Sequence, residues 1–306
     1  MDGTIARPRP FLALGLRLIT AFALATMGML VKLAGENGAH LVELIFWRQA
    51  VTFALIGGGL LILRKAAILR SDRMKSHGVR AAMGITGMFF TYGAVLLLPL
   101  AEATTLSFSA PFFAVLIAVV LFGERVGIYR SLAVVLGFGG VLIVMQPGGM
   151  AGGAAEGVTM WGVAVALIAA FMVALISFQI QDLNKTENPW AIVFWFTALT
   201  LPILAVALPF FWASHPSWTW TLIFATALAG GVVQILLTSS LRFGSAAVIL
   251  LMDYTALLWA TWYGYAVFDR AAPATLWLGA PLIVGAGALI AWRERALARS
   301  VKKAAA

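Results

Sequence analysis

Long apolar runs separated by short polar segments occupy most of this chain. A bilayer core about 30 Å thick needs roughly 20 helical residues to cross it. Windows of that length predict ten membrane-spanning helices, near residues 11–33, 41–63, 77–98, 103–122, 128–146, 158–180, 190–212, 219–240, 246–268 and 275–292. Because a helix satisfies its own backbone hydrogen bonds inside lipid, we predict an all-α membrane protein with no separate soluble domain.

The composition agrees with this class and excludes several others. Of the 306 residues, 62% are hydrophobic and only 11% are charged, roughly half the charged share of a soluble domain. Cysteine is absent, which excludes disulfides, thiolate metal sites and cysteine nucleophiles. His40, His77 and His215 fall in or near predicted loops, so we expect no metal and no cofactor.

Lys and Arg are concentrated in alternate loops and in both tails, which predicts the orientation of the chain. The cations on this side are Arg7, Arg9, Arg64, Lys65, Arg70, Arg73, Lys75, Arg80, Arg125, Arg130, Lys185, Arg242, Arg293, Arg295, Arg299, Lys302 and Lys303. The opposite loops carry no cation except Arg270. Because cytoplasmic loops are enriched in Lys and Arg, the N- and C-termini are predicted to be cytoplasmic. This pattern explains the net charge of +9 without any partner nucleic acid.

The two halves of the chain resemble each other weakly at an offset of 145 residues. A Gly-rich linker at 147–157 separates a first repeat, residues 1–146, from a second, residues 158–306 with its basic tail. At this offset Glu124–Arg125 falls on Asp269–Arg270. Each half has five predicted spans, an odd number, so the second must be inserted upside down. Two inverted five-helix repeats are a transporter architecture, with the substrate site near the midplane.

Asp253 is the most informative single residue. It is the one formal charge in the interior of the apolar stretch that begins at Arg242 and ends on Asp269–Arg270. A carboxylate at such a depth is unfavourable in lipid and marks a functional site by default. We expect it to exchange a proton or to receive the ammonium group of a zwitterionic substrate. A structural hydrogen bond is the alternative, because small residues follow it at intervals of four and allow close helix packing.

Further candidates for substrate binding lie in the fourth span. Phe108 is the positional counterpart of Asp253, and Ser107 precedes it. Pro111 has no N–H and leaves a carbonyl of the preceding turn free, which predicts a broken or kinked helix that lines a cavity. Ser and Thr often donate to carbonyls of their own helix instead, so each hydroxyl keeps a structural alternative.

Aromatic and polar side chains of other spans complete the predicted site. Tyr254 and Trp259 offer flat amphipathic surfaces to a substrate ring, with packing between helices as the alternative. Tyr92, Gln234 and Thr238 are polar groups at depth. Such groups need a partner, either the substrate or a neighbouring helix.

Charged residues near the ends of spans receive a structural interpretation. Lys32 is expected to extend its ammonium group to the membrane interface. Glu43 is also interpreted as structural, and Arg48 either extends to the interface or is buried against a carboxylate of another span. Asp269–Arg270 is interpreted as a marker of the outer boundary.

Three stretches resemble the EamA-type branch of the drug/metabolite transporter (DMT) superfamily. They are Phe46–Trp47–Arg48, the run 99–125 with the pattern P-L-x-x-A-T-x-L-x-F-x-x-P-F-F, and the run 252–260 that begins Met252–Asp253–Tyr254. The resemblance implies a secondary transporter with a central cavity lined by spans 1, 3, 4, 6, 8 and 9, which acts by alternating access. The second copy departs from the family in ending Phe268–Asp269–Arg270 where Phe-Gly-Glu is usual.

We therefore expect a multi-pass transporter of the cytoplasmic membrane, not an enzyme, whose partners are a small-molecule substrate and membrane lipids. Export of an amino acid or related metabolite is the leading hypothesis, with protons as the coupling ion through Asp253. Uptake of a vitamin or a sulfonium metabolite is the alternative. A lipid scramblase or a membrane-embedded enzyme represents another class, but one mid-depth Asp without a companion disfavours hydrolytic or metal chemistry. The chain acts as a monomer or a homodimer.

Overall fold

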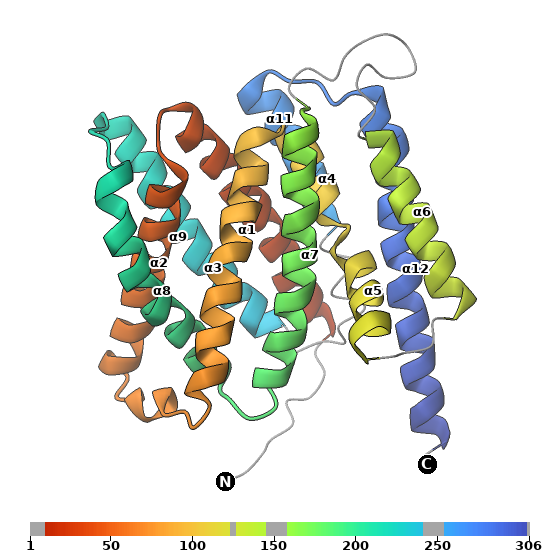
Figure 1. Ribbon diagram of the computed structural model, residues 1–306, viewed down its shortest axis with the longest axis horizontal. Coiled ribbons are helices and arrows are strands. Elements are labelled where there is room, and N and C mark those ends of the chain that lie inside the picture. Colours follow the sequence, from red (N-terminus) through yellow and green to blue (C-terminus); the bar gives the residue numbers. More distant parts are fainter. Residues whose placement is uncertain (1–9, 123–126, 145–157, 241–253, 305–306) are drawn as a thin grey trace.

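The computed structural model is a bundle of helices packed side by side (Figure 1). It describes residues 10–122, 127–144, 158–240 and 254–304, and every regular element in these residues is helical. The predicted linker at 147–157 and Asp253 lie outside the described residues.

The helices fall on either side of the predicted linker. Before it lie α1 (Pro10–Glu36), α2 (Leu41–Ile62), the 3₁₀ turn η1 (Ala66–Leu69), α3 (Met74–Leu97), α4 (Leu100–Ser107), α5 (Ala110–Phe122) and α6 (Ile128–Val144). After it lie α7 (Met160–Leu183), α8 (Pro189–Phe211), α9 (Ser217–Ser240), α11 (Thr255–Phe268) and α12 (Ala274–Ala304).

Several described helices are long and apolar enough to cross a membrane. These stretches are Leu18–Glu36, Leu41–Ile62, Met74–Leu97, Leu100–Val120, Met160–Leu183 and Pro189–Phe211. Shorter apolar helices cover Ser131–Val144 and Ala274–Leu289. The all-helical fold is therefore confirmed, and by length and composition it is compatible with a membrane protein, whereas the ten spans, their repeat and the side of the termini stay predictions.

Polar residues start helices where the sequence provides a cap. The imidazole of His40 accepts from the N–H of Val42, while the Glu43 carboxylate accepts from the N–H of His40. At the start of α8, Asn188 caps the helix and Pro189 takes the first position, where a missing N–H is harmless. These caps satisfy donors that the helix itself leaves free.

The fourth span is interrupted at Phe108 and Ser109, between α4 and α5. The N–H of Phe108 donates to the Thr105 carbonyl at 3.1 Å, and that of Ser109 to the Leu106 carbonyl at 3.0 Å. These are tight three-residue bonds. Pro111 has no N–H with which to continue the four-residue ladder. The helix is thus broken where the position of Pro111 predicts a break.

The most extensive helix contacts join the two halves of the chain. Helix α1 packs on α9 and α11, α2 on α8 and α9, and α3 on α7 and α8, while α4 and α5 pack on α7 and α6 packs on α12. In Figure 1, α6 and α12 stand together at one edge of the bundle. The hydrophobic clusters are accordingly mixed, since Leu44 and Ile45 of α2 share one with Leu204 of α8 and Ile223 of α9.

Candidate functional site

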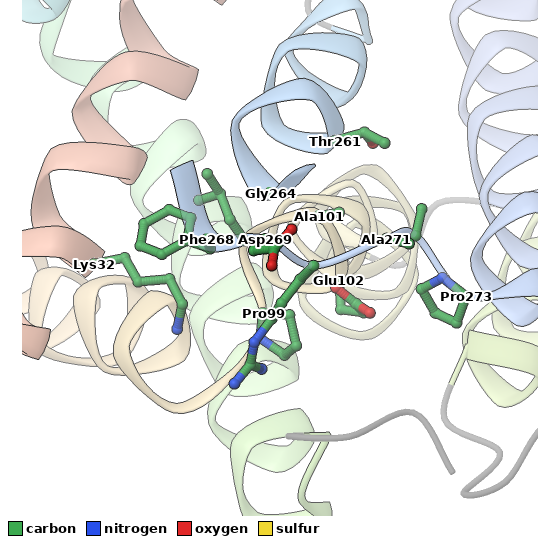
Figure 2. A pocket seen from close by; sticks show the side chains of 13 residues that line it. Lys32, Pro99, Ala101, Glu102, Thr261, Gly264, Phe268, Asp269, Ala271 and Pro273 are labelled. Carbon is green, nitrogen blue, oxygen red and sulfur yellow. The ribbon is translucent and has the colours of Figure 1, made fainter. Parts of the chain in front are cut away.

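A cavity of about 430 Å³ lies where α1 ends, α4 begins and α11 leads into the loop before α12 (Figure 2). Its lining includes four charged residues, Lys32, Glu102, Asp269 and Arg270. In Figure 2, Lys32, Glu102 and Asp269 come from three separate parts of the chain and border the same space. The volume lies within the range of small-molecule sites.

Lys32 is held inside the protein by the end of α3. Its side chain is only 6% exposed. Its Nζ donates to the Leu98 carbonyl at 2.9 Å and to the Val95 carbonyl at 3.4 Å. Carbonyls at the end of a helix have no partner within it, so they are free to accept from an ammonium group. The expected extension to the membrane interface is therefore wrong for Lys32.

Glu102 enters the site because α4 begins earlier than predicted. The sequence placed the start of this span at residue 103, but the helix starts at Leu100 with Pro99 as its cap. Glu102 thus lies in the first turn and is 4% exposed. A carboxylate in a first turn interacts favourably with the helix dipole. The positive charges of Arg270 and Lys32 also act on it.

The turn after α11 brings Asp269 and Arg270 to the cavity. Asp269 takes a left-handed conformation (φ 50°, ψ 37°), which Asp tolerates better than most residues. The N–H of Arg270 donates to the Gly264 carbonyl at 2.9 Å. The aromatic ring of Phe268 lies 5.9 Å from Lys32 Nζ. The pair interpreted as a boundary marker therefore lines a cavity.

The arrangement combines both signs of charge around one space. Two cations and two carboxylates stand beside the hydroxyl of Thr261 and the ring of Phe268. Lys32 and Glu102 are buried, whereas Asp269 and Arg270 are exposed, and buried charges are unfavourable unless they are paired or hydrogen-bonded. A solute that carries an ammonium and a carboxylate group matches such a lining, because each of its charges meets an opposite one.

A second contact joins Phe108 and Tyr254, both predicted site residues. Their ring centroids are 4.8 Å apart and the rings meet edge to face. Phe108 lies in the break between α4 and α5, and Tyr254 directly precedes α11. The Tyr254 hydroxyl rests against Gly287 of α12. Helix α5 begins at Ala110 and α11 begins at Thr255, which is 145 residues later, so the two halves meet at equivalent helix starts.

Other predicted site residues lie elsewhere. Ser107 is exposed and donates to the Thr104 carbonyl of its own helix at 2.6 Å. Trp259 packs edge-on against Phe22 of α1, with centroids 4.9 Å apart. Asp253 lies outside the described residues, as does the side chain of Thr238 on α9.

Tyr92 and Gln234 belong to the interior around α1, α3 and α9. Tyr92 is 3% exposed, and its hydroxyl donates to the Met27 sulfur at 3.9 Å. Gln234 is half-buried on α9 and has an interaction partner. Of the predicted residues, the structure thus brings Phe108 and Tyr254 together. Lys32 and Glu102 were missed, and the signal that could have found them is a charge near the end of one apolar run and a charge at the start of another.

Comparisons with known proteins place the chain among small-molecule transporters. Residues 11–146 match the model of the EamA-like transporter family. The chain is 27% identical over 276 residues to the pseudopaline exporter CntI of Pseudomonas aeruginosa, covering 88% of this chain and 92% of that protein. It is 29% identical over 252 residues to the riboflavin transporter of Rhizobium johnstonii, covering 81% and 80%. A solved crystal structure with 21% identity resembles the fold with a TM-score of 0.61, covering 92% of this chain and 98% of that one.

Proposed function

Because the chain belongs to the drug/metabolite transporter superfamily, we propose that it exports a small zwitterionic metabolite, an amino acid or a related compound, by alternating access. It is a small-molecule transporter and not an enzyme, and it is a multi-pass protein of the cell membrane. The substrate class, the direction and the mechanism form the proposal.

The proposed substrate class is based on the charged residues that line the cavity. Lys32 and Arg270 suit the carboxylate of a zwitterion, and Glu102 and Asp269 suit its ammonium group. A bound zwitterion places its negative group beside the two cations and its positive group beside the two carboxylates, whereas an uncharged solute offers neither charge. The ring of Phe268 adds an apolar surface for the side chain of the solute.

The pattern of helix contacts supports alternating access between inverted repeats. We pair α1 with α7, α2 with α8, α3 with α9, α4 and α5 with α11, and α6 with α12. Under this exchange the contact of α1 with α9 becomes that of α7 with α3, and the contact of α2 with α9 becomes that of α8 with α3. The contacts of α2 with α8 and of α6 with α12 map onto themselves. Packing related by a two-fold axis is expected of inverted repeats, which we propose for residues 1–146 and 158–306. Both termini are proposed to be cytoplasmic.

Direction and coupling rest on two further points. The similarity to a pseudopaline exporter favours export. Asp253, in the apolar stretch that precedes α11, is proposed to carry the coupling proton, because an ionisable residue within a membrane span is functional by default. Transport of a vitamin is the second candidate, favoured by the similarity to a riboflavin transporter.

The test is solute flux in liposomes that contain the purified chain. A panel of amino acids and riboflavin is assayed with and without a pH gradient. We expect a zwitterion to be moved, and Glu102→Gln to lower its flux about tenfold, since a hydrogen bond to a charged group is worth roughly 1.5–3 kcal/mol. Asp253→Asn should remove the effect of the pH gradient.

The matched control is Asp72→Asn, an exposed carboxylate in the loop before α3, which should leave flux unchanged. Flux of riboflavin without flux of any zwitterion would contradict the proposed substrate class. A pH-gradient effect that persists in Asp253→Asn would contradict proton coupling through Asp253.

A further inference from the structure

Two buried arginines face the same part of the bundle interior. Arg48 on α2 is 8% exposed and Arg80 on α3 is 6% exposed. Nη1 of Arg48 lies 3.3 Å from the sulfur of Met88, and Nη1 of Arg80 lies against Gly84. Gly84 and Met88 are four residues, about one turn, apart on α3, so the two side chains approach the same stretch of this helix. They are close enough for the charge of Arg48 to act on Arg80.

Neither guanidinium group is neutralised within the part of the chain that the structure describes. Two carboxylates of the bundle pair with histidines instead, Glu43 with His215 and Glu187 with His77. Among the described residues, the buried Nε of Arg48 has no hydrogen-bond acceptor, and neither have Nε and Nη1 of Arg80. Arg80 was counted among the cytoplasmic cations and is instead enclosed in the bundle. Two uncompensated charges this close repel each other, and each is costly to bury alone.

The contacts of the two side chains provide only weak hydrogen-bond acceptors for their N–H groups. The bond from Arg48 Nη1 to the Gln49 amide oxygen is long, at 3.5 Å, and a thioether is a weak acceptor. The Phe196 ring of α8 lies 4.3 Å from the Arg80 guanidinium carbon. An aromatic ring stacks on the flat face of a guanidinium group, whereas the N–H groups of arginine donate hydrogen bonds within the plane of that group. The in-plane donors therefore stay available for a ligand.

Glycines on two helices provide the room in which these side chains lie. A Cβ added to Gly230 of α9 would lie 2.6 Å from Nε of Arg48, and one added to Gly84 would overlap Nη1 of Arg80. Beside them, Gln49 Nε2 donates to the Thr200 hydroxyl of α8 at 2.6 Å. Residues of four helices, α2, α3, α8 and α9, thus surround the two cations closely and provide few acceptors for them.

We propose that Arg48 and Arg80 form a binding site for a carboxylate group, placed between α2, α3, α8 and α9. The guanidinium fork matches the two oxygens of a carboxylate, and one such group would accept from both arginines and offset their repulsion. The site shares no residue with the lining of the cavity around Lys32 and Glu102. The binding of a carboxylate at this site is independent of the proposed function. Only the identification of that carboxylate as part of the transported solute rests on the proposed function.

The test measures thermal unfolding of the full chain in phosphatidylcholine nanodiscs. Acetate serves as the carboxylate probe, ethylamine as a matched cation without a carboxylate, and chloride as an inorganic anion. We expect acetate to raise the unfolding temperature in a saturable way, because a ligand that binds the folded state stabilises it, and ethylamine to have no such effect. The acetate shift should disappear in Arg48→Gln and in Arg80→Gln, and should persist in the control Arg70→Gln, an exposed cation after η1.

Arg80→Met separates ligand binding from a structural role. Removing an uncompensated buried charge should raise the unfolding temperature without acetate and abolish the shift with it, whereas a purely structural arginine would give a lower temperature in both conditions. An equal shift with chloride would overturn the carboxylate assignment in favour of a general anion site. An acetate shift that persists in both Gln variants would overturn the site itself. If the wild-type protein bound acetate but moved no zwitterion in liposomes, the proposed substrate would be contradicted and the carboxylate site would stand.

Discussion

Glu43 ties the start of α2 to a segment about 170 residues away. Its side chain is fully buried. It accepts from the N–H of His40 at 2.9 Å, from Nε2 of His215 at 2.9 Å, and from the N–H of Ala213 at 3.3 Å. The structural interpretation made from the sequence fits these contacts, although their partners could not be read from the sequence, since His215 and Ala213 lie in a distant loop.

Replacing Glu43 with Ala should destabilise the protein strongly. The change leaves three partly buried donors without their acceptor, and a fully buried unsatisfied group costs about 1–3 kcal/mol. With partial relaxation, we expect a loss of about 2–4 kcal/mol in the free energy of unfolding, measured by denaturant titration in detergent micelles. Asp72→Ala, at an exposed position in the loop before α3, is the control and should be nearly neutral. A similar loss in both variants would show that Glu43 has no special structural role.

At the scale of elements, the break between α4 and α5 places Phe108 against Tyr254. Pro111 causes this break because it cannot donate to the carbonyl of Ser107. In Pro111→Ala that bond can form, which favours one continuous helix. A backbone hydrogen bond contributes about 1 kcal/mol, enough to shift a two-state equilibrium about fivefold. We expect solute flux to fall by about that factor, together with slower amide exchange at residues 107–111.

Pro202→Ala is the matched control for this substitution. Pro202 lies inside α8, which continues through it, and its side chain is exposed. Flux should stay at the wild-type level in this variant. If both substitutions reduced flux equally, the break at Phe108 would have no particular part in transport.

Helix existence and approximate bounds were predictable because apolar length determines what crosses a bilayer. The residues at which the helices end were less predictable. Helix α12 continues to Ala304 rather than stopping near residue 292, since Ala, Arg and Lys favour a helix outside lipid as well. The burial of Lys32 was not predicted, because it depends on the end of α3. For Arg48 burial was one of two alternatives, but its neighbour Gly230 of α9 could not be read from the sequence. A local pattern supports only the default that long cations extend to the interface.

At the scale of the molecule, the predicted orientation can be tested directly because the chain contains no cysteine. Single cysteines are placed at four exposed positions, Asn37, Ser214, Arg70 and Lys185. In intact cells a membrane-impermeant thiol reagent should label the variants at 37 and 214 and spare those at 70 and 185, because the Lys- and Arg-rich loops are cytoplasmic. All four should react after the membrane is opened, which controls for accessibility. The reverse labelling pattern would mean that the orientation is inverted.

The packing of the two halves onto each other has a consequence for the order of events during synthesis. Helices α1, α2 and α3 leave the ribosome long before α7, α8 and α9, on which they pack. Until those arrive, the early helices rest in lipid without their main neighbours, and Arg48 and Arg80 lack the walls formed by Gly230 and Phe196. A chain that stops near its midpoint therefore leaves two cations without the neighbours that enclose them in the complete bundle.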